Sequence, residues 1–200
     1  MTRFAAPLLL TGLLTACSTP SLAGPNPKAA RAAYDAMPIS SLTSAPRRVT
    51  TKVRLTRPVA EVWAYLGNHQ NLLEYSDGVL GKVTVDDSQA DSPQGVGTAR
   101  QCVTGDGKDR FVEKVVYYRA PYAFAYSAVE NTWGLKDHLA TVSLTPDGEG
   151  GTVVQWDQYF NHMMPEMTSK VATNIGGMLN GKILPFLAKK FGGEVLVAGR

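Results

Sequence analysis

The stretch that decides the fold of this chain runs from Met163 to Gly193 and reads MMPEMTSKVATNIGGMLNGKILPFLAKKFGG. Its apolar residues recur at steps of three and four, which places them along one side of an α-helix. They are Met164, Met167, Val171, Ile175, Met178, Leu179, Ile183, Phe186 and Leu187. Pro185 removes a helical hydrogen bond and is expected to kink or break the helix. A stripe of this kind must be buried, so the sequence predicts a partner surface elsewhere in the chain.

The expected partner is a β-sheet, because most of the chain before the helix alternates apolar and polar residues or is rich in β-branched and aromatic ones. The predicted strands cover residues 47–55, 79–85, 96–103, 110–118, 123–129, 135–144 and 152–160. Two short helices follow the first strand, one opened by Pro58 and ended by Gly67, the other running through Leu72 and Tyr75. Strands joined by short turns pair antiparallel. The predicted class is therefore α+β, with a curved seven-stranded antiparallel sheet around a long C-terminal helix.

The composition is that of one ordinary domain. The chain has 200 residues, 44% hydrophobic and 18% charged, which supports one core. The formal net charge is +3, and the positive residues are scattered rather than clustered. A nucleic-acid partner is therefore not expected.

The N-terminus carries a targeting signal. Arg3 precedes a short apolar run from Phe4 to Leu14, which ends in Leu14-Thr15-Ala16-Cys17. This arrangement resembles a bacterial lipoprotein signal peptide. The resemblance implies removal of residues 1–16, acylation of Cys17 and a membrane anchor in the cell envelope, on the outer membrane facing the periplasm. The alternative is ordinary secretion after Ser21-Leu22-Ala23, which gives a soluble periplasmic or secreted protein.

Residues 17–46 are expected to form the lipidated cysteine and a flexible tether, because they are rich in Pro, Ser, Ala and Gly. Within them, a short helix from Pro27 to Met37 is possible. The folded domain is expected over residues 47–193, with a C-terminal tail over 194–200. Cys102 then remains as a single thiol, and we interpret it as a core residue.

Several segments together resemble the polyketide cyclase/dehydrase and lipid-transport family of the START-like, or SRPBCC, superfamily. They are Pro58–Leu66, Gly95–Arg100, Val112–Val115 with Tyr118, Pro121, Phe124 and Tyr126, and Gly151–Trp156. The resemblance covers about residues 47–193. It implies a helix-grip fold with an apolar cavity between the sheet and the C-terminal helix. Because such a fold hosts carriers, cyclases, hydrolases and regulatory domains, it does not imply one activity.

The candidate ligand-binding residues are large apolar or aromatic side chains of the strands and the helix. They are Tyr117, Phe124, Tyr126, Trp133, Trp156, Met164, Met167, Val171, Ile175 and Met178. Methionine side chains adapt to irregular ligands, and aromatic ones add large apolar faces. The alternative for each of these residues is plain core.

Two polar residues are weak catalytic candidates. Glu113 shares one side of its strand with Phe111, Val115 and Tyr117, so it is expected to point inward and to pair with Arg100. His138 shares the side of Ala140, Val142 and Leu144 and could act as a general base, or be a satisfied structural group. The sequence has no spacing typical of a metal site, a covalent nucleophile or a cofactor site, and none of these is expected.

The sequence is compatible with three functions. The first is an envelope lipoprotein that binds or carries a hydrophobic small molecule, such as a lipid, a sterol or a polyketide-like compound. The second is a cyclase- or dehydratase-type enzyme acting on an apolar substrate in the same cavity. The third is a non-catalytic interaction module in envelope assembly, with a collapsed cavity.

Overall fold

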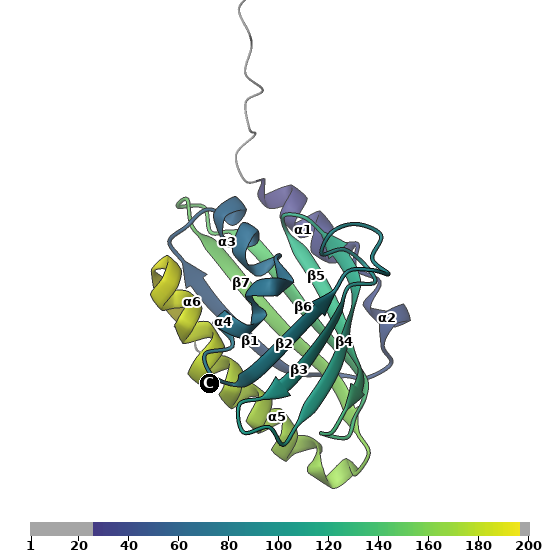
Figure 1. The fold of residues 1–200 in the computed structure, drawn as a ribbon. Coiled ribbons are helices and arrows are strands. Elements are labelled where there is room, and N and C mark those ends of the chain that lie inside the picture. The colour runs from purple at the N-terminus through teal and green to yellow at the C-terminus, as the bar shows by residue number, and fades with distance from the viewer. Residues whose placement is uncertain (1–25, 197–200) are drawn as a thin grey trace, which may run out of the picture.

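The computed structural model describes residues 26–196, which form one large antiparallel sheet with helices on both faces (Figure 1). The predicted signal peptide, the predicted lipidation site at Cys17 and the rest of the chain up to residue 25 lie outside this range, as do residues 197–200. No helix within residues 26–196 has both the length and the apolar character needed to cross a bilayer.

The sheet confirms the predicted α+β architecture. Its strands are β1 (Arg47–Leu55), β2 (Leu80–Asp86), β3 (Ala99–Thr104), β4 (Arg110–Arg119), β5 (Ala123–Asn131), β6 (Leu135–Pro146), β7 (Thr152–His162) and β8 (Gly193–Leu196). Their order is β2-β3-β4-β5-β6-β7-β1-β8. The six strands β2 to β7 form a meander, and β1 is inserted beside β7. The sheet curves around the C-terminal helix (Figure 1).

The predicted number of seven strands is one too low, since the described residues contain eight. Gly192 and Gly193 adopt φ angles of 70° and 129°, a region that favours glycine, and they reverse the chain after the last helix. The chain then pairs with the otherwise open edge of β1, where Lys52 lies opposite Leu196. Part of the predicted tail is therefore a strand, because a free edge has unsatisfied backbone groups.

Helices fill the concave face of the sheet. Three short elements follow β1, as predicted: α3 (Val59–Leu66), the 3-10 turn η1 (His69–Asn71) and α4 (Leu72–Tyr75). The C-terminal segment consists of the 3-10 turn η2 (Pro165–Met167), α5 (Thr168–Met178), the π-helical turn η3 (Leu179–Ile183) and α6 (Leu184–Phe191). The chain stays helical from Thr168 to Phe191. The interruption predicted at Pro185 takes the form of a π-helical turn rather than a break.

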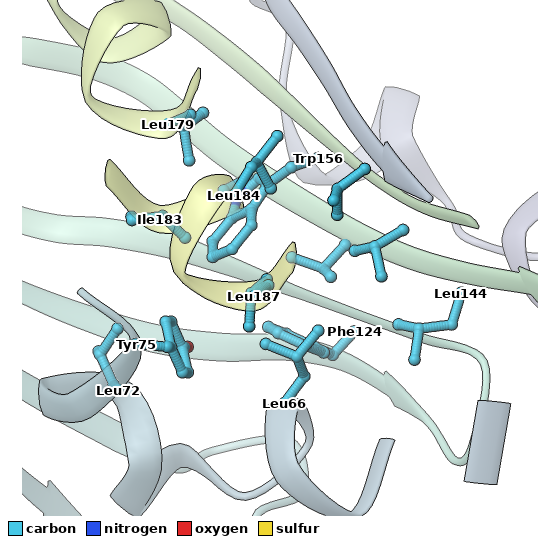
Figure 2. Close-up of a cluster of buried hydrophobic side chains, with 14 of the residues drawn as sticks. Leu66, Leu72, Tyr75, Phe124, Leu144, Trp156, Leu179, Ile183, Leu184 and Leu187 are labelled. Atoms are coloured by element: carbon cyan, nitrogen blue, oxygen red, sulfur yellow. The ribbon is translucent and has the colours of Figure 1, made fainter. Parts of the chain in front are cut away.

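The main core lies between these helices and the concave face. Leu179, Ile183, Leu184 and Leu187 from the C-terminal helix meet side chains of α3, α4 and the central strands (Figure 2). Leu184 and Leu187 are fully buried. Burying side chains of this size contributes about 1.5–3 kcal/mol each. The apolar stripe read from the sequence is thus the inner face of the helix.

The opposite, convex face is covered by α1 (Pro27–Asp35) and α2 (Ile39–Leu42). Met37, between them, is 5% exposed and packs in a cluster with Tyr117, Leu139 and Tyr159. The Tyr34 hydroxyl donates to the Asp157 carboxylate at 3.0 Å. The expected flexible tether over residues 17–46 is therefore wrong for residues 27–46. A few apolar residues without a sustained period suffice to dock this segment, because the sheet offers them a complementary face.

We expect Met37→Ala to lower the free energy of unfolding by about 2–4 kcal/mol, because it leaves a cavity in the convex-face cluster. Urea denaturation followed by circular dichroism measures this change. Met163→Ala is the matched control, since Met163 is 64% exposed and its replacement should change stability by less than about 0.5 kcal/mol. Equal, negligible effects of both substitutions would mean that residues 27–46 are a tether after all.

Candidate functional site

A cavity of about 90 Å³ lies between the sheet and the α5–η3 part of the C-terminal helix. Most of its wall is apolar or aromatic, with a few polar side chains. The wall includes Phe111, Glu113, Tyr126, Trp133, His138, Trp156, Gln158, Ile175 and Met178. An apolar hollow with a small number of placed polar groups is the usual form of a small-molecule site.

Five of the ten predicted ligand-binding residues line this cavity: Tyr126, Trp133, Trp156, Ile175 and Met178. Phe124 and Val171 belong to the same core but lie outside the cavity wall. Met167 is only partly buried, and Met164 is 51% exposed. The reason is that the α-helix begins at Thr168, after a 3-10 turn at Pro165. The first two methionines of the stripe therefore precede the helix and do not face the sheet.

Tyr117 lies on the wrong face for the predicted role. The pairing of β4 with β5 shifts between Val115 and Tyr117, so a β-bulge inverts the alternation at this point. Tyr117 consequently faces the convex side, where its hydroxyl donates to the Ala33 carbonyl at 2.6 Å. Its neighbour Tyr118 takes the concave side and packs on Trp63, with ring centroids 5.1 Å apart.

An aromatic pair lies at one end of the cavity. Phe111 and Trp133 meet edge to face with centroids 5.0 Å apart. Trp133 lies in the turn between β5 and β6, and His162 holds this turn. The Nε2 of His162 is 2.8 Å from the Trp133 carbonyl, while its Nδ1 accepts from the Met164 amide at 2.9 Å. His162 thus ties the Trp133 turn to the start of the C-terminal helix.

The predicted pair of Glu113 and Arg100 is present. Arg100 Nη2 lies 2.7 Å from Glu113 Oε2, with side-chain exposures of 1% and 16%. The two residues are directly opposite in the β3–β4 register. The guanidinium also lies over the Tyr126 ring, 4.0 Å from its centroid. Burial alone would lower the pKa of Arg100, but the Glu113 charge outweighs it and raises this pKa. The charge is therefore held in place beneath the cavity by a carboxylate and an aromatic face.

His69 completes the polar cluster around Arg100. It is fully buried, and its Nδ1 lies 3.4 Å from Arg100 Nη1. Burial, aided by the Arg100 charge, lowers the pKa of His69 to about 3. The ring is thus neutral in the folded protein at ordinary pH, so Nδ1 can accept from the guanidinium.

His138 faces the cavity as predicted, but both of its ring nitrogens are engaged. Nδ1 accepts from the Ala128 amide at 2.9 Å, so the proton is on Nε2, which lies 2.9 Å from Gln158 Oε1. Burial lowers the pKa of His138, against the opposing effect of the Gln158 hydrogen bond. A neutral imidazole with both nitrogens satisfied is a structural group rather than a poised base.

Comparison with known families matches residues 46–183 to the polyketide cyclase/dehydrase and lipid transport family. The chain belongs to this family. The match spans β1 to η3 and so includes the whole cavity wall. A comparison with curated proteins gives no match.

Solved structures similar to this family member have the same fold. A solution structure from Thermobifida fusca is 22% identical with a TM-score of 0.61, covering 72% of this chain and 92% of that one. A START superfamily protein from Mycobacterium smegmatis is 11% identical with a TM-score of 0.58, covering 71% and 97%. Truncated norcoclaurine synthase from Thalictrum flavum is 16% identical with a TM-score of 0.58, covering 74% and 94%. These likenesses show a START-like helix-grip fold.

A polar wall residue that the sequence pattern did not single out is Gln158. It lines the cavity and is 4% exposed. The two-residue alternation along β7 could have identified it. Val154, Trp156 and Phe160 lie on the concave face of this strand, and Gln158 is the polar residue in the same series. A polar side chain at an inward position needs a partner, which here is His138.

We expect the stability of this domain to fall as the pH drops from 6.5 to 4.5. The unfolded chain protonates His69 near pH 6.5, whereas the folded chain does so only near 3. The unfolded state therefore binds more protons in this window, and His69 contributes a loss of about 1.4 kcal/mol per pH unit. Urea denaturation at several pH values measures the slope. His69→Gln should make it shallower, and a flat profile in the native protein would contradict a buried neutral His69.

We also expect strong energetic coupling between Arg100 and Glu113. Either single change, Arg100→Met or Glu113→Leu, leaves an unpaired buried charge and should cost about 3–5 kcal/mol. The double variant should cost less than the sum by about 2–3 kcal/mol. The exposed pair of Lys108 and Asp106 is the control and should show no measurable coupling. Additive effects at Arg100 and Glu113 would show that the pair is not coupled in the native protein.

Proposed function

We propose that this protein binds or carries a hydrophobic small molecule in the cavity between its sheet and its C-terminal helix. The observation that carries the proposal is the apolar space bounded by Tyr126, Trp156, Ile175 and Met178. Protein interiors are normally packed to the density of organic crystals, so an open space of this kind lowers stability and calls for another explanation. Membership of a family described as polyketide cyclase, dehydrase and lipid transport supports the same reading.

The volume of about 90 Å³ limits the ligand that the cavity accepts in this state. A dry engineered cavity of about 150 Å³ holds benzene, whereas typical ligand pockets measure about 300–1,000 Å³. In this state the ligand is therefore no larger than a single ring, or it is part of a longer molecule. A whole lipid requires the α5–η3 segment to move outward.

We further propose that the protein acts at a membrane of the bacterial cell envelope, anchored through acylated Cys17. The support is the Leu14-Thr15-Ala16-Cys17 sequence at the end of an apolar run. Because α1 begins at Pro27, only residues 18–26 would separate the anchor from the folded domain. Nine residues reach at most about 30 Å, which would keep the domain close to the lipid surface. Mass spectrometry of the mature N-terminus tests this part, and a chain beginning after Ala23 without acyl groups would contradict it.

An enzyme of cyclase or dehydratase type is the second candidate, and Glu113 is the observation in its favour. It is the carboxylate in the cavity wall, and the contact to Arg100 uses its Oε2. A carboxylate with one oxygen directed to a substrate can transfer a proton. Loss of turnover in Glu113→Gln, in an assay that shows turnover, would favour this candidate over simple binding.

We expect the purified protein to retain an apolar molecule that native mass spectrometry and solvent extraction detect. Met178→Trp should fill the cavity and reduce the retained ligand at least about tenfold, because the added side chain occupies its volume. Thr173→Trp is the matched control on the exposed side of the same helix and should retain the ligand. The proposal fails if the unaltered protein retains no apolar molecule and binds no single-ring aromatic probe.

A further inference from the structure

The orientation of the Gln158 amide is fixed by the protein itself. The Ala128 amide donates to His138 Nδ1, which leaves the ring proton on Nε2, and this proton points to Gln158 Oε1 at 2.9 Å. The amide oxygen is therefore occupied, and the amide nitrogen is on the other branch of the side chain. Among residues 26–196, no group accepts a hydrogen bond from this nitrogen. Since Gln158 is in the cavity wall, its amide nitrogen is the hydrogen-bond donor that this residue offers to a ligand.

A second donor in the same wall also has no partner. Trp156 is 2% exposed and lines the cavity, and its buried Nε1 has no hydrogen bond of good geometry within the described residues. The Tyr126 hydroxyl is the polar group near it. Trp156 and Gln158 are two residues apart on β7, so both side chains rise from the same face of one strand. An unpaired buried donor is costly, and buried polar groups in native proteins are normally satisfied. The wall therefore offers hydrogen-bond donors that a ligand with an acceptor could satisfy.

The charge of the site limits which acceptor can meet this demand. Glu113 is in the wall, and its own counter-charge, Arg100, is 1% exposed and already paired with it. A carboxylate ligand would bring a second negative charge to a space of about 90 Å³ without a free cation among the wall residues. Such a charge would be buried without compensation. The acceptor must therefore be uncharged.

We propose that the ligand bound here is an uncharged, ring-sized apolar molecule whose carbonyl oxygen accepts a hydrogen bond from the Gln158 amide, with Trp156 Nε1 as a second donor. This inference rests on the proposed binding function and adds the chemical class of the ligand. Gln158 is then the residue that sets specificity, and His138 positions it by holding its oxygen.

Two probes of the same shape test this inference. Acetophenone carries a carbonyl oxygen where α-methylstyrene carries a methylene group, and benzoate is the anionic counterpart. Dissociation constants are measured by calorimetry or nuclear magnetic resonance on a form of the chain beginning at Ser18, which contains every described element. The readout is the ratio of the constant for α-methylstyrene to that for acetophenone, compared between variants so that the different hydrophobicity of the two probes cancels.

We expect this ratio to fall about fivefold in Gln158→Met, which removes the donor. Gln158→Glu keeps an oxygen that can accept from His138 but replaces the amide N–H₂ group. It should lower the ratio at least as much as Gln158→Met does. This second variant keeps the test informative if the first folds poorly. Gln155→Met is the matched control, because Gln155 lies on the other face of the same strand and its amide donates to Asp157. Acetophenone, but not α-methylstyrene, should also shift the indole N–H resonance of Trp156.

The outcomes separate this inference from the proposed function. If both neutral probes bind but the ratio is the same in the native protein and both Gln158 variants, the acceptor-specific site is wrong and the apolar cavity stands. If benzoate binds as tightly as acetophenone, the exclusion of anions is wrong. If none of the three probes binds, the proposed binding function fails as well.

Discussion

The constraint on which the structure depends is the burial of one helix against the concave face of a curved sheet. The two ends of that helix serve different purposes. Leu184 and Leu187 of α6 are fully buried, and Lys190 links α6 to Glu74 of α4 by an ion pair of 2.9 Å. The α5–η3 part instead covers the cavity through Ile175 and Met178. Both halves of the helix therefore bury apolar side chains, and only the α5–η3 half lines the cavity.

Beneath the cavity, a buried charge organises the polar side chains. Arg100 is the largest side chain that is fully buried in the described structure, and its charge demands partners with fixed geometry. Glu113 neutralises it, Tyr126 offers a ring face, and His69 accepts from it in the neutral form. A separate chain of two hydrogen bonds links the Ala128 amide to His138 and His138 to Gln158. These contacts come from β3, β4, β5, β6, β7 and η1, so the floor of the cavity is defined by elements far apart in the sequence.

The sequence predicted the fold well because the fold rests on periodicity. The two-residue alternation located β1 to β7, the three- and four-residue steps located the helix, and Pro58 and Gly67 bounded α3. The site was predicted less completely, since β-bulges change which residues share a face. The shift before Tyr117 sent this residue to the convex side. The docking of residues 27–46 and the pairing of β8 depend on surfaces formed by distant strands, so no local pattern indicates them. Gln158 could have been found from its inward position on β7, whereas its orientation depends on His138.

Under the proposed function, the helix rather than the sheet sets the size of ligand that the cavity accepts. The strands around the cavity are fixed by ladders of hydrogen bonds on both sides, and widening them would break many bonds together. The helix over the cavity contains Gly176, Gly177 and Gly181 and passes through a π-helical turn. A side chain at Gly177 or Gly181 would meet no atom within 4 Å, so close packing does not require glycine at these two positions. Each glycine instead makes the helix less stable than alanine would, by about 0.5–1 kcal/mol. The most easily deformed part of the helix therefore lies directly over the cavity, and outward movement of this part is the least costly way to admit a ligand larger than one ring.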